Sequence, residues 1–419
     1  MLRRIEKFFA KQLNRNLAIK NLVKSIYTLP FNLVGSFFFK SKIVGAVVEF
    51  GEDSKESFFG YYDLKPDNFD GKVLCHQSIH STFMSPNPNN QVEICVFNID
   101  DPKKPIFTTT SNAFNWQQGS RLQWLDKKKF IFNDFCEETK KYIARVIDLD
   151  KNFEEKVISM PIQSLINSDE YLSINYHRLA ALRPDYGYFN IDPATLLLNN
   201  LDDDGIWKVS IKENSSKLIY SLHEIINFNK KTENNNLHHK VNHLMLSPNK
   251  KNFLIIHRSF DGKKRFGRLL IGNVNGKGLV ELPSNKMVSH YTWLNNDEVL
   301  GYLSIKDKKD GYFKINIRSN SIDEMKSLNA LTLGDGHPIC IKENIIVTDS
   351  YPDRFGFQSL YIYDSHKNSA NKIAYLRHPR QYKLENRCDL HPKPSVNDNY
   401  FYFDSVMTNK RRFYRYKIQ

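Results

Sequence analysis

The sequence predicts an all-β protein: a seven-bladed β-propeller over residues 44–419, preceded by a short basic amphipathic segment in residues 1–43. Three observations lead to this fold class. Short apolar and aromatic segments alternate with turns rich in Asn, Asp, Gly and Lys, as in successive antiparallel strands. A unit made of a polar turn and a following strand recurs along the chain. Aromatic residues, which favour strands, make up 13% of the chain.

The N-terminal segment is predicted to form a basic amphipathic helix over residues 2–28. Its apolar residues recur mostly at three- and four-residue steps, and Lys and Arg are prominent among the others. We expect this helix to break at Pro30, because proline lacks the backbone N–H that a helix interior needs. The helix either lies on an anionic membrane surface, through residues 1–40, or packs on the propeller with its basic face in solvent.

Each blade is predicted to hold an inner strand, a polar turn, and a second, third and fourth strand. One residue marks each second strand: Val73, Phe130, Tyr188, Phe253, Val299, Ile345 and Tyr400. Their spacing, about 46 to 65 residues, is typical of propeller blades, although periodicity alone also allows six or eight. Residues 44–50 form a free strand that should complete the last blade, because a closed ring has no exposed edge. Residues 192–200 and 226–240 are expected to be insertions on one face.

The chain carries 60 Lys and Arg against 46 Asp and Glu, a net charge of +14. This excess favours an anionic partner: nucleic acid, an anionic lipid surface or an acidic polysaccharide. No nucleic-acid-binding module is recognisable, so no nucleic acid is expected. Five cysteines without a C-x-x-C pair argue against a disulfide framework. The N-terminus has no signal-peptide pattern, which predicts a cytoplasmic protein, held at the inner face of the membrane if the helix binds lipid.

Histidines open four consecutive inner strands of the predicted ring: His243, His290, His337 and His391. Inner strands converge on the axis of a propeller, so we expect these imidazoles to meet although they are far apart in sequence. Cys388 and Asp389 lie just before the last of them. Imidazoles grouped with a thiolate or a carboxylate bind transition metals, here zinc or manganese by ligand type. The alternative is a polar funnel without metal.

Two further groups of residues have substrate-binding chemistry. The first is Asn115, Trp116, Gln117 and Gln118. Amides and an indole suit a sugar, but the same residues also suit a buried turn network with the indole as a wedge between blades. The second is Tyr176, His177, Arg178 and Arg183. Guanidiniums can neutralise a substrate carboxylate while a base and an acid act nearby; the alternative is that both arginines are structural, paired with Asp185.

Short motifs scattered over residues 58–419 resemble those of the propeller polysaccharide lyases, the group that includes oligogalacturonate lyase and the ulvan lyases. The motifs are Gly60-Tyr61-Tyr62-Asp63, Trp116-Gln117-Gln118-Gly119, Gly334-Asp335-Gly336-His337-Pro338, Thr348-Asp349-Ser350-Tyr351-Pro352-Asp353, Arg387-Cys388-Asp389-Leu390-His391-Pro392 and Phe403-Asp404-Ser405. The resemblance implies β-elimination on a uronate. In that reaction an arginine or a metal neutralises the carboxylate, a His or Tyr removes the proton at C5, and the glycosidic oxygen at C4 leaves.

The resemblance also implies roles for individual residues. The metal ligands would be His243, His337, Cys388 and His391. Arg178 would hold the substrate carboxylate, with Tyr176 and His177 as the acid and base. Independently of the resemblance, His290 and the amide-rich group around Trp116 are expected to contact the substrate. His76 and His80 are the candidates for the histidines that the family carries in its early blades, and His76 is expected to contact the substrate.

Together, these observations favour an enzyme that acts on acidic, uronate-containing polysaccharide, by elimination. Two other function classes stay open. One is a cytoplasmic, membrane-associated protein of surface-polysaccharide assembly, which binds a glycan or transfers to it without lyase activity; the lack of an export signal favours it. The other is a scaffold whose rim binds proteins, a frequent use of propellers.

Overall fold

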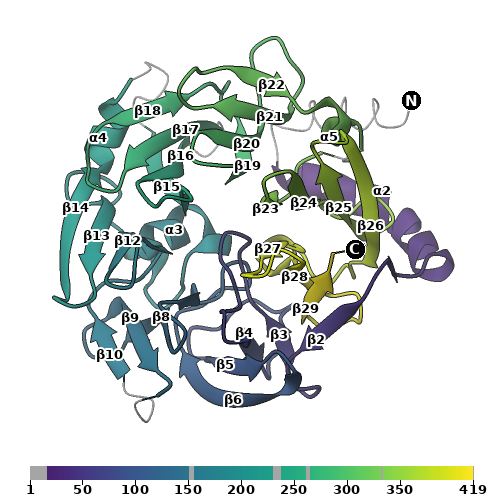
Figure 1. Ribbon diagram of the computed structural model, residues 1–419, viewed down its shortest axis with the longest axis horizontal. Helices are drawn as coiled ribbons and strands as arrows, with labels where there is room; N and C mark the ends of the chain where they lie inside the picture. Colours follow the sequence, from purple (N-terminus) through teal and green to yellow (C-terminus); the bar gives the residue numbers. More distant parts are fainter. Residues whose placement is uncertain (1–16, 151–154, 230–236, 261–264, 332–333, 419) are drawn as a thin grey trace.

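A computed structural model describes residues 17–150, 155–229, 237–260, 265–331 and 334–418. Within these ranges the strands form seven antiparallel sheets, six of four strands and one of five, set radially around a central axis (Figure 1). The predicted seven-bladed β-propeller is therefore confirmed.

The first four blades follow the chain from the inner strand outward. Blade 1 contains β3 (Glu56–Phe58), β4 (Lys72–Ser78), β5 (Val92–Asn98) and β6 (Asp101–Ser111). Blade 2 contains β7 (Gln123–Trp124), β8 (Lys129–Cys136), β9 (Lys141–Asp148) and β10 (Glu155–Ile158). Blade 3 contains β11 (Ser164–Leu165), β12 (Glu170–Ile174), β13 (Gly205–Ser210) and β14 (Ser215–Ser221). Blade 4 contains β15 (His238–Leu246), β16 (Asn252–Phe260), β17 (Arg265–Asn273) and β18 (Leu279–Leu282).

Blade 5 also follows the chain, whereas blades 6 and 7 each include a strand from the N-terminal part of the chain. Blade 5 contains β19 (Val288–Trp293), β20 (Glu298–Leu303), β21 (Gly311–Asn316) and β22 (Ile322–Glu324). Blade 6 contains β23 (Ile339–Lys342), β24 (Ile345–Asp349), β25 (Phe357–Asp364), β26 (Ser369–Arg377) and, at its outer edge, β1 (Lys42–Ile43). Blade 7 contains β27 (Lys393–Pro394), β28 (Tyr400–Ser405), β29 (Arg412–Lys417) and β2 (Val47–Phe50). Short helices in the connections are α4 (Leu222–Asn227), α5 (Lys326–Leu331) and η5 (Leu384–Asn386).

The ring is closed by a strand from near each end of the chain. In blade 7, β2 pairs with β29 in antiparallel register, from Val47 opposite Tyr416 to Phe50 opposite Phe413. The predicted closing strand is thus confirmed, although it starts at Val47. Pairing of this kind satisfies the backbone groups that an open sheet edge would expose.

Apolar side chains fill the spaces between neighbouring blades. Phe253 of blade 4 packs against Tyr220 of blade 3 with ring centroids 5.9 Å apart. Phe130 of blade 2 packs against Phe107 of blade 1 at 6.0 Å. Since each middle strand has neighbours on both faces, its residues are buried almost continuously, as in β16. Many of the Phe and Tyr side chains of the sequence are buried in the propeller.

Helix α2 (Leu17–Phe38) continues through Pro30, so the prediction that the helix breaks there was wrong. Proline removes one backbone hydrogen bond, and packing against blade 6 outweighs that loss. The Nδ2 of Asn32 donates to the Arg354 carbonyl at 2.9 Å, and the Phe31 ring lies 5.8 Å from that of Phe355. Residues 2–16 of the predicted helix lie outside the described residues. No helix in the described part of the chain is long and apolar enough to span a bilayer.

Blade 3 differs from the prediction in one strand. Its second strand is β12, and Tyr188 belongs instead to an insertion between β12 and β13. This insertion holds α3 (Tyr176–Leu182), η2 (Pro184–Tyr186) and η3 (Pro193–Thr195), and the last of these falls in the short helical stretch expected over 192–200. Tyr188 resembles a strand residue because it is fully buried, stacked on Tyr176 at 4.5 Å. Of the predicted polar loop at 226–240, residues 230–236 lie outside the described residues.

Candidate functional site

The inner strands bring the four histidines of the C-terminal blades together. His243 and His290 lie in β15 and β19, whereas His337 and His391 come just before β23 and β27. Along this row the ring centroids are 5.5 Å, 4.1 Å and 4.2 Å apart, and all four side chains are buried. We call these four residues the histidine group. They meet because each stands at the same place in its blade.

Two members of the histidine group have an unusual backbone. His243 and His391 have φ of 55° and 43°, in the left-handed region that residues with a side chain rarely adopt. At His243 the pairing register of β15 with β16 shifts between Asn242 and Met245. Strained backbone of this kind is concentrated at functional sites.

The segment between β3 and β4 reaches the ring centre and lies against the histidine group (Figure 1). It is held in place at both sides. The backbone N–H groups of Phe59 and Gly60 donate to the Asp404 carboxylate at 3.0 Å and 3.2 Å. The buried Arg121 guanidinium makes a bidentate pair with Asp63, at 2.9 Å and 2.8 Å. These anchors fix the two tyrosines between them.

Tyr61 and Tyr62 contact the histidines directly. The Tyr61 hydroxyl is hydrogen-bonded to Nδ1 of His243, and its ring lies 5.0 Å from that of His391. The Tyr62 hydroxyl donates to the Tyr291 carbonyl at 3.0 Å. Burial raises the pKa of Tyr61 well above its usual value, so the phenol keeps its proton. Burial lowers the pKa of His243 well below its usual value, so the imidazole is neutral.

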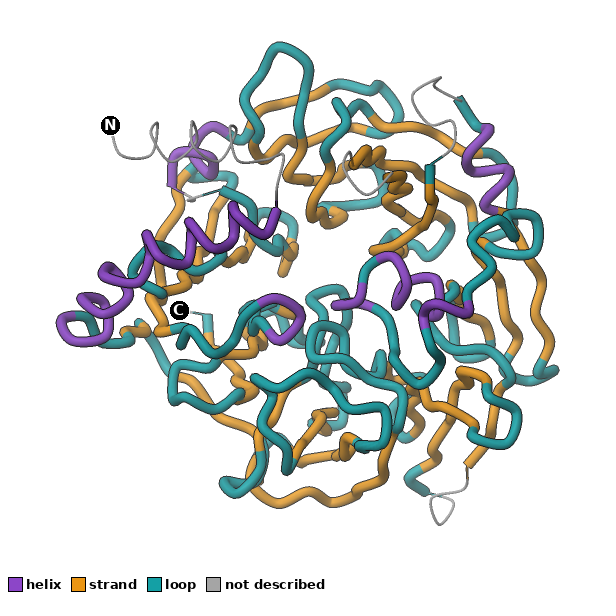
Figure 2. Tube along the Cα trace, turned by 180° about the vertical axis from the view of Figure 1, so that it is seen from behind, coloured by secondary structure: helices purple, strands orange, loops and turns teal. Residues whose placement is uncertain are grey.

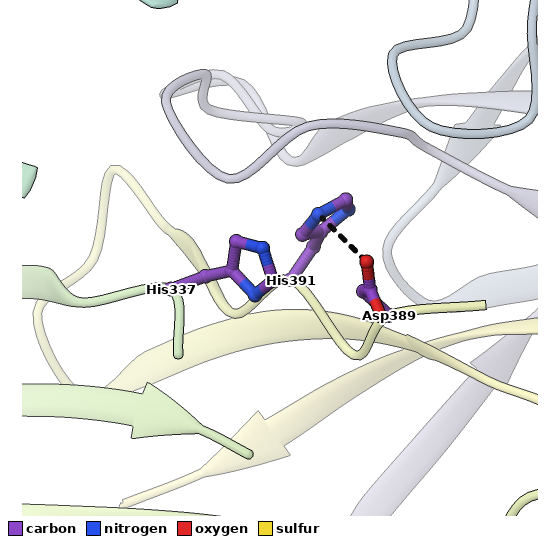
Figure 3. A group of neighbouring side chains, drawn as sticks. All are labelled: His337, Asp389 and His391. Carbon is purple, nitrogen blue, oxygen red and sulfur yellow. Dashed lines mark ion pairs between the residues drawn. The ribbon is translucent and has the colours of Figure 1, made fainter. Parts of the chain in front are cut away.

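Three side chains could hold a metal ion: His337, Asp389 and His391. One ligand atom from each lies within 4.8 Å of the others, and Nε2 of His391 is 4.0 Å from Oδ2 of Asp389 (Figure 3). The Nε2 atoms of His337 and His391 are buried and have no hydrogen-bond partner among the described residues. Leaving a buried polar atom unpaired costs about 1–3 kcal/mol. Two imidazoles and a carboxylate fit the ligand preferences of zinc and manganese.

Asp349, at the end of β24, holds both of these histidines. Its carboxylate accepts the backbone N–H of His337 at 2.7 Å and that of His391 at 3.0 Å. It also lies 2.9 Å from Nδ1 of His337. A carboxylate at Nδ1 keeps the proton there and leaves the lone pair on Nε2, which is how metal-binding histidines are usually oriented.

The charge states in this group follow from burial and from neighbouring charges. Burial alone would lower the pKa of His337, but the charge and hydrogen bond of Asp349 outweigh it, so that pKa is raised. Burial, followed by the charge of His337, lowers the pKa of His391 well below its usual value. Burial alone would raise the pKa of Asp389, but Arg387, bound to it at 2.7 Å, keeps it below its usual value. Asp389 is therefore ionised and able to bind a cation.

Three half-buried guanidiniums border the histidine group: Arg183, Arg258 and Arg387. We call them the arginine rim. Arg387 lies over the Tyr351 ring at 5.2 Å, and Arg183 lies over the Tyr186 ring at 4.9 Å. The Tyr186 ring is in turn 5.0 Å from that of His243. Burial, followed by the charge of Arg183, lowers the pKa of Arg258, whose Nε has no hydrogen-bond partner within the described ranges. Arg183 is paired with Asp185 at 2.8 Å, as the structural alternative for this residue expected, and Arg387 is paired with Asp389 at 2.7 Å. Arg258 has no ion-pair partner among the described residues, so it is the rim cation best placed to meet an anionic ligand.

Of the predicted acid, base and clamp residues, Arg183 alone lies beside the histidine group. The Arg178 guanidinium is buried, paired with Asp204 and hydrogen-bonded to backbone carbonyls. The Tyr176 hydroxyl donates to the Ile162 carbonyl at 3.0 Å. The His177 imidazole contacts the Asp192 carbonyl at 2.9 Å, within the insertion. These three residues thus hold the insertion of blade 3 together, and among the described residues they make no hydrogen bond or ion pair with the histidine group.

The Cys388 thiol does not point toward the metal-ligand atoms. It lies in a small buried cluster with Tyr382 and Val406, and burial raises its pKa to about 12. It is therefore a neutral thiol in apolar surroundings rather than a thiolate ligand. The neighbouring residue, Asp389, supplies the carboxylate instead.

The predicted sugar-binding residues of blades 1 and 2 form a buried network. Asn115 accepts the N–H groups of Gln117 and Gln118 at 3.0 Å and 2.7 Å, and Trp116 donates to the Met84 carbonyl. His76 is hydrogen-bonded to Ser120 at 2.8 Å and stacks on Phe58. The network reaches the arginine rim at one point, where the Gln117 amide donates to the Arg387 carbonyl at 2.6 Å.

Sequence reasoning alone did not assign several residues of the site. Asp389 precedes His391 in the sequence but is not among the predicted ligands, and Asp349 appears only within the motif Thr348-Asp349-Ser350-Tyr351-Pro352-Asp353. An extended chain places residues i and i+2 on one side, so the spacing of Asp389 and His391 was a usable signal. Arg258 gave no signal, because nothing in its strand distinguishes it from a surface arginine.

Comparison with known proteins shows the fold and no more. No protein-family model matches the sequence, and no curated protein matches it. The chain is similar to the structure of oligogalacturonate lyase in complex with manganese, with a TM-score of 0.59 and 12% identity over 91% of this chain and 98% of that one. It is also similar to oligogalacturonate lyase from Vibrio parahaemolyticus, with a TM-score of 0.56 and 12% identity over 91% of this chain and 99% of that one. At this identity the likeness supports the propeller architecture and not the activity.

Proposed function

We propose that the histidine group and the arginine rim bind the carboxylate of a uronate-containing polysaccharide, and that the site cleaves it by β-elimination with a divalent metal. The observation that carries this proposal is the pair of buried, unpartnered Nε2 atoms beside an ionised carboxylate. The oligogalacturonate lyase structure that shares this fold is in complex with manganese, which makes manganese one of the metals to test. The net charge of +14 would draw an acidic polymer toward the protein.

His337, Asp389 and His391 would hold the metal, with Asp349 fixing the two histidines. Bound there, a divalent ion would withdraw charge from the substrate carboxylate and make the proton at C5 more acidic. Arg258 would pair with the remaining carboxylate charge, whereas Arg183 and Arg387 are already paired with Asp185 and Asp389. The three metal-ligand side chains are buried, whereas the arginine rim is half-buried. The rim is therefore the part of the site that a polymer would contact.

The hydrogen-bonded pair of His243 and Tyr61 supplies an acid and a base. The neutral imidazole accepts the proton from C5, and the C5–H electrons form the C4=C5 double bond as the C4–O bond breaks. The protonated phenol donates to the departing oxygen. This pair takes the roles that the resemblance gave to Tyr176 and His177, which lie within the blade 3 insertion.

Elimination creates an unsaturated uronate that absorbs in the ultraviolet, so activity is tested by absorbance with uronate polymers, with added manganese or zinc. We expect His391→Ala to abolish both the absorbance change and the metal content found by elemental analysis. His177→Ala is the matched control, since it removes an imidazole outside the site, and should keep both. No absorbance change with any polymer and either metal would refute the lyase assignment. Binding of the polymer without that change would instead favour the polysaccharide-assembly alternative.

A further inference from the structure

Helix α2 has two unlike faces. One face is fixed to the loop between β24 and β25 of blade 6. A side chain at Gly35 would collide with the Phe355 carbonyl, because an added Cβ would come within 2.3 Å of its oxygen. Asn32 is buried and donates to the Arg354 carbonyl, and the Arg354 guanidinium lies 5.6 Å from the Phe31 ring. This face is therefore a closely packed contact.

The other face carries large apolar side chains in solvent. The exposed fractions are 44% for Leu29, 52% for Leu33, 43% for Val34, 82% for Phe37 and 78% for Phe38. At 3.6 residues per turn, these positions lie on the side of the helix away from Asn32 and Gly35. Five neighbouring apolar residues form a continuous exposed patch, and patches of this kind mark an interaction site. We call this patch the α2 apolar face.

The charges beside the α2 apolar face are positive. Lys40 and Lys42 follow the helix, are exposed, and have no ion-pair partner among the described residues. In the sequence, residues 1–28 contain seven Lys or Arg and one acidic residue, Glu6. Apolar residues flanked by cations are the pattern of a helix that lies in the interface of an anionic bilayer.

We propose that the α2 apolar face docks the protein on an anionic membrane surface, with Phe37 and Phe38 inserted between lipid head groups and Lys40 and Lys42 near the phosphates. Figure 2 shows α2 lying along the ring on the side that also carries α3 of the blade 3 insertion. The β24–β25 loop that holds α2 also contributes Tyr351, which lies under Arg387 of the arginine rim. Docking through α2 therefore brings the face of the ring that bears the rim close to the lipid surface.

Flotation of the full chain with vesicles tests this proposal. We expect binding to vesicles of phosphatidylcholine mixed with phosphatidylglycerol, weaker binding to phosphatidylcholine alone, and release by salt. The double variant Phe37→Ser/Phe38→Ser should bind at least about tenfold more weakly. Phe69→Ser is the matched control, because Phe69 is equally exposed (78%) in the turn before β4. Both variants should keep the wild-type unfolding temperature, since the replaced rings are in solvent.

Equal flotation of the wild type and the double variant would overturn the proposal, as would a wild type that does not float. Light scattering tests whether the α2 apolar face instead binds a second copy of the chain. A wild-type dimer that Phe37→Ser/Phe38→Ser converts to a monomer would show that the α2 apolar face binds a second copy, and would also overturn it. Since none of these residues belongs to the histidine group, the ultraviolet assay with soluble polymer should be unchanged in the double variant. The two proposals can therefore fail separately.

Discussion

Replacing Asp349 by Asn should weaken metal binding without removing a metal ligand. The Asp349 carboxylate accepts the backbone N–H groups of His337 and His391 and lies 2.9 Å from Nδ1 of His337. Asparagine has the same shape but only one oxygen, so its NH₂ group must face one of these donors. The Nδ1–H of His337 then loses its charged partner, and the imidazole can turn or exchange its tautomer.

The size of the effect follows from this arrangement. Loss of a partner that orients a metal-binding histidine usually costs 10–100-fold in affinity, which is about 1.4–2.7 kcal/mol. We expect a value near the upper end, because one carboxylate orients two ligands here. Competition with a fluorescent chelator measures the affinity for manganese and zinc, and thermal unfolding shows whether the variant is folded.

Asp335→Asn is the matched control. Asp335 lies 3.1 Å from Nδ1 of His290, which is outside the group of three ligand atoms, so this variant should bind metal as the wild type does. If Asp349→Asn is folded and binds metal with wild-type affinity, Asp349 does not orient the ligands and the account of the site is wrong. If both variants lose metal equally, His290 belongs among the ligands.

Three further predictions concern residues outside the ligand group. Arg178→Met should lower the free energy of unfolding by about 3–5 kcal/mol in urea titration, because Asp204 stays buried without its partner; an unchanged stability would contradict this. Cys388→Ala should cost about 1 kcal/mol and leave the metal content unchanged by elemental analysis, whereas loss of metal would make the sulfur a ligand. Burial lowers the pKa of His76 from 6.5 to about 3, so the unfolded chain takes up a proton there below pH 6.5 and the folded chain does not. The free energy of unfolding should therefore decrease as the pH is lowered, by about 2 kcal/mol between neutral pH and pH 5. His76→Gln should remove that part of the pH dependence of urea unfolding.

The blade repeat was visible in the sequence because turns and strands have strong local preferences. The second strands at Val73, Phe130 and Phe253 begin directly after polar turns, and these positions are second strands in the structure. Tyr188 was wrongly predicted to mark a second strand, because an insertion can bury aromatic residues as a strand does. The helix end at Pro30 was also misplaced, since contacts with blade 6, distant in sequence, decide how far α2 extends.

The sequence predicted where in the propeller the site lies, but not which side chains contact one another there. Four histidines at equivalent positions of four blades had to meet once the fold was a propeller. Which neighbour joins them depends on side-chain direction: Cys388 points into an apolar cluster and Asp389 toward His391. Arg178 was indistinguishable from a substrate arginine, because its partner, Asp204, is 26 residues away on the other side of the insertion.

Closure of the ring has a consequence for how the protein is made. The strand β2 cannot pair until β29 has been synthesised, and Val47 and Tyr416 are separated by most of the chain. At roughly 5–20 residues per second, a ribosome needs about 20–70 s to cover that distance. During this time a short, apolar edge strand stands without its partner, and His391 has not yet joined the other histidines. The four histidines can therefore come together only at the end of translation, when the last blade has been made and β29 can pair with β2.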